Sequence, residues 1–92
     1  MQTLIESTEY IQPYSTRSPV KVTYRVWKTT DGCLNGSGEV VDSPWINVSS
    51  RLKLTGEDPI KEAKLVKRRL EDDLLFLIYE LEDELDRLAA CR

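Results

Sequence analysis

Apolar residues recur every three or four positions through the last third of the chain. The row consists of Val66, Leu70, Leu74, Leu77, Leu81, Leu85 and Leu88. Steps of three and four residues place side chains on one side of an α-helix. Good helix formers dominate this stretch, and neither glycine nor proline occurs from residue 60 to residue 92. The sequence therefore predicts one long helix over residues 58–90, whose apolar side the rest of the chain has to cover.

The expected helix begins at Asp58, which can accept hydrogen bonds from the first free amides, and Pro59 fits the first helical position. At about 1.5 Å per residue such a helix is roughly 50 Å long. A compact domain of this size has a radius of gyration of only about 12 Å. We therefore expect part of the helix to project, to meet another chain, or to be kinked. Residues 74–79 are apolar on every side, so loops, the N-terminal arm or a second chain should cover what the sheet does not.

The charges of the expected helix oppose its dipole. Its first third carries the cations Lys61, Lys64, Lys67, Arg68 and Arg69, and its last third carries the acids Glu80, Glu82, Asp83, Glu84 and Asp86. A helix dipole favours the reverse order. Pairs four residues apart, such as Lys67 with Glu71 and Asp83 with Arg87, recover part of this cost locally. An antiparallel homodimer would recover more, because each basic third would face an acidic end.

The first two thirds of the chain have the alternation of β-strands. Residues 20–29 are the clearest strand, with Val20, Val22, Tyr24 and Val26 on one side. Two turn dipeptides follow, Asp31-Gly32 and Asn35-Gly36, so a return strand is expected at 38–42. Residues 45–54 alternate again, residues 2–12 favour extended structure, and residues 13–19 form a proline-containing loop. The sequence therefore predicts one α+β domain over residues 1–92. In it a three- or four-stranded antiparallel β-meander packs on one long C-terminal α-helix.

The same alternation predicts a cationic face on the far side of the sheet. If the apolar residues face the helix, the opposite face carries Lys21, Thr23, Arg25, Trp27, Asn47, Ser49, Arg51 and Lys53. Lysine and arginine suit phosphates, and a tryptophan can stack on a base. The alternative is a sheet face that is simply wet. We take Lys21, Arg25, Trp27, Arg51 and Lys53 as candidate residues for binding a partner or nucleic acid.

Two further surfaces lie on the expected helix. Lys61, Lys64 and Arg68 share one side and form a second basic patch that could contact a partner or nucleic acid. The acidic stretch from residue 80 to residue 86 could imitate nucleic acid in a basic groove of a partner. For both surfaces the alternative is a solvated charged face.

No catalytic, metal or cofactor motif is found in the sequence. The chain has no histidine, which removes the commonest general base and metal ligand. Cys33 has no base beside it in the sequence, and Cys33 and Cys91 are expected to be reduced rather than bridged. There is no phosphate-binding or dinucleotide-binding loop. We therefore expect a protein that is not an enzyme and that holds no cofactor or metal.

The 92 residues carry a net charge of −3 that is unevenly distributed. Residues 1–56 have 6 basic and 5 acidic side chains, and residues 57–92 have 7 and 11. The sequence has no secretory signal and no membrane-spanning run, so a cytoplasmic location is expected, the host cytoplasm if the protein is phage-encoded. In small size, acidity and lack of a catalytic site, the chain resembles phage- or plasmid-encoded inhibitors of host complexes, anti-CRISPR proteins among them.

That resemblance implies a non-enzymatic protein that inhibits or adapts a macromolecular complex, which would contain protein and nucleic acid. One alternative is an RNA- or DNA-binding regulator that acts alone through the basic sheet face. The other is a structural or assembly factor that dimerises through its helix.

Overall fold

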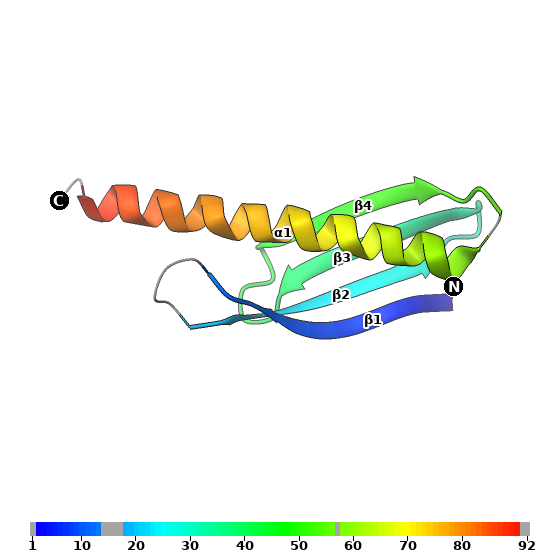
Figure 1. Ribbon diagram of the computed structural model, residues 1–92, viewed down its shortest axis with the longest axis horizontal. Helices are drawn as coiled ribbons and strands as arrows, with labels where there is room; N and C mark the ends of the chain where they lie inside the picture. The colour runs from blue at the N-terminus through cyan, green and yellow to red at the C-terminus, as the bar shows by residue number, and fades with distance from the viewer. Residues whose placement is uncertain (1, 14–17, 57, 91–92) are drawn as a thin grey trace.

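The computed structural model describes residues 2–13, 18–56 and 58–90, and the expectations for Cys91 and for residues 14–17 lie outside them. The elements are β1 (Gln2–Ile11), β2 (Val20–Lys28), β3 (Cys33–Val40), β4 (Asn47–Lys53) and α1 (Pro59–Ala90). The four strands form one open antiparallel sheet in the order β1-β2-β3-β4, and α1 packs on one of its faces (Figure 1). This is the predicted α+β architecture, and the sheet has four strands because the segment predicted to be extended over residues 2–12 forms β1.

The hairpin between β2 and β3 differs from the prediction. It turns at Asp31-Gly32, where Gly32 has a φ of 80° that favours glycine. The second dipeptide, Asn35-Gly36, lies inside β3 and pairs with Trp27 and Val26 of β2. The expected return strand is therefore present, but it runs from Cys33 to Val40 instead of over 38–42, and the expectation of a second turn is wrong.

The core lies between α1 and the side of the sheet predicted to be apolar. Val22, Tyr24 and Val26 of β2 are buried, as predicted, and pack with Leu34 of β3. From α1 the buried apolar residues are Ala63, Val66, Leu70, Leu74 and Ile78. Successive residues of this set are three, four, four and four positions apart. The buried side of α1 therefore shifts gradually around the helix axis.

At Gly36 of β3, side chains of α1 pack directly on the strand backbone. A Cβ atom built on this glycine would lie 2.7 Å from Val66 Cγ1 and 2.8 Å from Leu70 Cδ1. Real side-chain carbons keep about 3.5–4.0 Å between them. Gly36, which was predicted to lie in a turn, is therefore needed for the packing of α1 on β3 and not for chain reversal.

The first turn of α1 is fixed by two carboxylates. Asp58 Oδ1 accepts hydrogen bonds from the amides of Ile60 (3.1 Å) and Lys61 (3.3 Å), which confirms the predicted cap. Glu62 is buried, and its Oε1 accepts from the amide (2.9 Å) and the hydroxyl (2.6 Å) of Thr55. These bonds tie the segment after β4 to the start of the helix.

The C-terminal part of α1 extends past the end of the sheet (Figure 1). The molecule measures 53 × 19 × 18 Å, and its radius of gyration of 15.3 Å exceeds that of a compact domain of this size. Of the three outcomes expected for so long a helix, projection is the one observed. The apolar middle of α1 is only partly covered, because Leu74 and Ile78 are buried while Phe76 remains 64% exposed.

Candidate binding face of the sheet

The sheet face turned away from α1 carries the candidate residues predicted from the alternation. We call it the open face, and no element of the described chain packs on it as α1 packs on the other side (Figure 1). Lys21, Arg25 and Trp27 lie on it from β2, and Arg51 and Lys53 lie on it from β4. The prediction that these five residues share one face is confirmed, while their role in binding stays a prediction.

Strands β2 and β4 are not neighbours, because β3 lies between them. The register aligns Trp27 with Asn35 of β3, and Asn35 in turn with Arg51 of β4. The next row aligns Arg25 with Ser37 and Ser49. Residues of β3 therefore stand between the predicted aromatic and cationic groups.

Acidic side chains from β1 and β3 partly neutralise the open face. The guanidinium of Arg25 lies 3.8 Å from a carboxylate oxygen of Glu6 and 3.8 Å from one of Glu39. All three side chains are about half exposed, so these ion pairs contribute little to stability. In contrast, Lys21 and Lys53 form no ion pair with any residue that the structure describes. The face is thus a mixed-charge surface with two unengaged lysines near opposite ends of the sheet.

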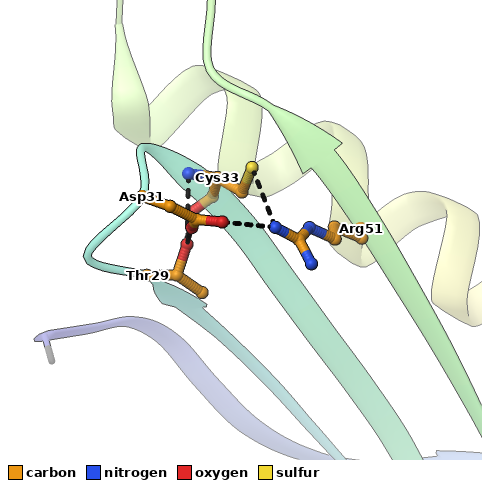
Figure 2. A network of polar contacts seen from close by, with 4 residues as sticks. All are labelled: Thr29, Asp31, Cys33 and Arg51. Carbon is orange, nitrogen blue, oxygen red and sulfur yellow. Dashed lines mark hydrogen bonds and ion pairs between the residues drawn. The ribbon is translucent and has the colours of Figure 1, made fainter.

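Arg51 belongs to a polar network at the β2–β3 turn (Figure 2). It donates to the carboxylate of Asp31, which also accepts from the hydroxyl of Thr29, and Cys33 Sγ lies 3.5 Å from Arg51 Nη2. The hydrogen bond from Thr29, with help from Arg51, lowers the pKa of Asp31. Contact with Cys33 and the charge of Asp31 raise the pKa of Arg51, which stays charged. The network orients Arg51 and ties the turn to β4.

A shallow depression of about 340 Å³ opens beside this network. The side chains of Trp27, Asn35, Ser37, Ser49 and Arg51 line it, together with Gly36 and Ser50. Asn35 Oδ1 is buried and accepts no hydrogen bond from the described residues. A buried acceptor without a donor is costly. The depression therefore offers an aromatic ring, a guanidinium and two hydroxyls, and the acceptor of Asn35 that lacks a donor is buried in its lining.

The second predicted patch lies elsewhere on the molecule. Lys61, Lys64 and Arg68 are exposed on α1, which covers the opposite side of the sheet, so the structure does not join them to the open face. Lys67 of the same basic third has a structural role. Its Nζ lies 2.6 Å from Glu9 Oε2 of β1, 3.2 Å from Glu71 Oε1, and 5.8 Å from the centre of the Tyr24 ring. The predicted pair of Lys67 with Glu71 is therefore present.

Within residues 2–13, 18–56 and 58–90, no three His, Cys, Asp or Glu side chains gather as metal ligands would. No helix of this described part is long and apolar enough to cross a membrane.

Protein-family models, curated proteins and solved structures were compared with the chain, and none matches it. The open face and its chemistry are therefore what indicates a function for this protein.

Sequence reasoning missed the β3 residues of this site. Asn35 was assigned to a turn and Ser37 precedes the strand expected at 38–42, although both line the depression between Trp27 and Arg51. The alternating positions 33, 35, 37 and 39, counted back from the apolar Val40, were the signal that could have placed them on the open face. The acidic partners Glu6 and Glu39 required the register as well, because they lie on strands other than that of Arg25.

Proposed function

We propose that this protein is a small non-enzymatic binding protein that attaches to a complex containing nucleic acid and inhibits or adapts it. The open face is its contact surface in this proposal. The observation that carries it is the row Trp27–Asn35–Arg51, which lines a depression and includes an acceptor without a donor among the described residues. An inhibitor of the type represented by phage-encoded inhibitors of host defence needs only such a surface and no chemistry of its own.

The depression suits an unpaired base of the complex. A base can stack on the indole of Trp27, as bases do on aromatic side chains in single-strand binding. Arg51 can approach the acceptor edge of that base or a phosphate. Asn35 Oδ1 is buried, so the Asn35 side chain would have to rotate before an exocyclic amino group of the base could donate to it. Lys21 and Lys53 then lie on either side of the depression to contact neighbouring phosphates.

Charge favours a nucleoprotein over free nucleic acid as the partner. The chain has a net charge of −3, and Glu6 and Glu39 lie beside Arg25 on the open face. An open face with so few unengaged cations gains little from counterion release, which dominates affinity for free nucleic acid. Contacts with the protein part of the complex would supply the remaining affinity.

The test compares two charge reversals in affinity capture from the native source. Lys21→Glu with Lys53→Glu changes the open face, and Lys61→Glu with Lys64→Glu is the matched control on α1. The wild type and the control should capture a complex that contains both protein and nucleic acid, and the open-face variant should lose it. Capture of that complex by the open-face variant would refute the proposal.

Tryptophan fluorescence tests the depression itself. The chain has two tryptophans, Trp27 and Trp45, so Trp45→Phe leaves Trp27 as the single reporter. The captured complex should quench Trp27, and Asn35→Ala should weaken binding without changing the circular dichroism spectrum. Tight binding of free oligonucleotides that falls steeply with salt would favour the regulator acting alone.

A further inference from the structure

The C-terminal part of α1 presents leucines that the sheet does not cover. Among the described residues, Ile78 is the last buried apolar residue of α1. Beyond it, Leu81 is 37% exposed, Leu85 is 53% exposed and Leu88 is 59% exposed. This is the segment that extends past the end of the sheet in Figure 1. An apolar side facing solvent over this length is unusual for a helix of a soluble chain.

These leucines form one continuous surface with a groove. Leu77, Leu81, Leu85 and Leu88 are spaced by four, four and three residues, so they lie on one side of the helix, and we call them the leucine stripe. Leu81 and Leu85 also line a groove of about 280 Å³ between α1 and the end of the sheet. The other apolar side chains of that groove include Val20, Val40, Ile46 and Ile78. The apolar surface therefore runs from the sheet end along the projecting helix.

Acidic side chains border the leucine stripe on both sides. At about 100° per residue, Glu80 and Glu84 follow one edge of the stripe, and both are exposed. On the other side Asp86 is exposed, whereas Glu82 is buried, at 3% exposure, and lines the groove. Between residues 77 and 90 the helix carries five acidic side chains and one basic side chain, a formal charge of 1 − 5 = −4. That one base, Arg87, lies 3.5 Å from Glu84.

The acidic border of the leucine stripe indicates which kind of molecule can bind there, a second copy of this chain or a partner protein. Two copies packed stripe against stripe would bring together two segments of charge −4, and their repulsion opposes a homodimer at this surface. We propose that the leucine stripe and its groove bind an amphipathic helix of a partner protein, one whose own apolar side is bordered by lysine and arginine. Leucines then pack against the partner's apolar residues, and the exposed acids Glu80, Glu84 and Asp86 meet its basic border.

The test uses two synthetic helical peptides that have the same leucine pattern and differ only in the residues on either side of the leucines. One carries lysine at the bordering positions and the other carries glutamate, and fluorescence anisotropy measures their binding to the full chain. The lysine peptide should bind at least about tenfold more tightly than the glutamate peptide, with a difference that shrinks as salt rises. Equal affinities would overturn the proposal.

Paired substitutions locate the site. Leu85→Lys with Leu88→Lys changes the stripe, and Leu65→Lys with Phe76→Lys changes two residues of α1 that are equally exposed, at 58% and 64%, but lie on another side of the helix. Because all four side chains are largely exposed, both variants should keep the circular dichroism and melting temperature of the wild type. The stripe variant should bind the lysine peptide at least about tenfold more weakly, and the control should bind it as the wild type does.

Two results would refute the assignment. If both variants bind the lysine peptide equally well, the stripe is not the site. If sedimentation shows a wild-type dimer that the stripe variant abolishes, a second copy occupies the stripe. Neither result bears on the open face, because every substituted residue lies on α1.

Discussion

Gly36→Ala should destabilise the protein, although alanine usually strengthens a strand relative to glycine. Gly36 lies in the middle of β3, where its missing side chain leaves room for α1. The added methyl would lie 2.7 Å from Val66 Cγ1 and 2.8 Å from Leu70 Cδ1. Restoring an ordinary contact requires a displacement of about 1 Å between strand and helix.

The magnitude follows from two opposing effects. Extra methyl groups in a packed core cost about 1–3 kcal/mol, whereas replacing glycine by alanine in a strand gains about 0.5–1 kcal/mol. The net loss is therefore about 1 kcal/mol, which lowers the melting temperature of a domain of this size by about 4–8 °C. If α1 did not cross β3 at this point, the substitution would raise the melting temperature, so the sign of the change tests the packing.

A double-mutant cycle separates this clash from other effects. Val66→Ala removes the methyl that the new side chain at position 36 would meet, and alone it should cost about 2 kcal/mol through lost burial. In the double variant the new methyl fills part of the vacated space, so the total cost should fall short of the sum of the two single costs by about 1 kcal/mol. Urea unfolding of the four proteins, followed by circular dichroism, measures this coupling. Strict additivity, or a Gly36→Ala variant that is more stable than the wild type, would refute the reasoning.

Two further predictions concern pH. The hydrogen bond with Lys67 lowers the pKa of Glu9 below 4.5, so its stabilising contribution is present above pH 4.5 and is lost as the pH falls through the folded-state pKa. Glu9→Gln should therefore cost about 0.5 kcal/mol at neutral pH, and urea unfolding should show this difference shrinking in acid. Burial raises the pKa of Tyr24 to about 12, so its contribution is present below pH 10.0 and is lost as the pH rises through 12. Over that range the wild type should lose stability relative to Tyr24→Phe, and parallel unfolding curves with equal pH dependence would contradict this.

The sequence predicted those elements whose signal is local and periodic. The helix was predicted over 58–90 and runs from Pro59 to Ala90, because its spacing and its Asp58 cap depend only on neighbouring residues. The alternation of β2 placed Val22, Tyr24 and Val26 correctly in the core. The assignment of β3 failed because Asn-Gly is a strong hairpin signal, whereas Gly36 is needed for a contact with α1, which lies far away in the sequence.

The candidate site was predicted only in part for a related reason. Periodicity gives the face of each strand, so Lys21, Arg25, Trp27, Arg51 and Lys53 were correctly grouped. Strand order and register decide which groups become neighbours, and these depend on contacts distant in sequence. For that reason the pairing of Arg25 with acids of β1 and β3, and the place of Asn35 between Trp27 and Arg51, became visible only in the structure.

The charges of α1 run against its helix dipole, and the structure shows what the basic third and the acidic third each contact. Its basic third lies over the sheet, where Lys67 reaches Glu9 of β1. Its acidic third lies mostly beyond the sheet, where it borders the leucine stripe. A second copy in antiparallel orientation could offer Lys61, Lys64 and Arg68 to these acids. It could offer the exposed Ile60 and Leu65 near them but no continuous apolar stripe, since Ala63, Val66 and Leu70 of that third are already buried against its own sheet. A partner that satisfies both the acids and the leucines must carry its cations and its apolar residues on one accessible helix, which is why we assign the projecting segment to a different protein.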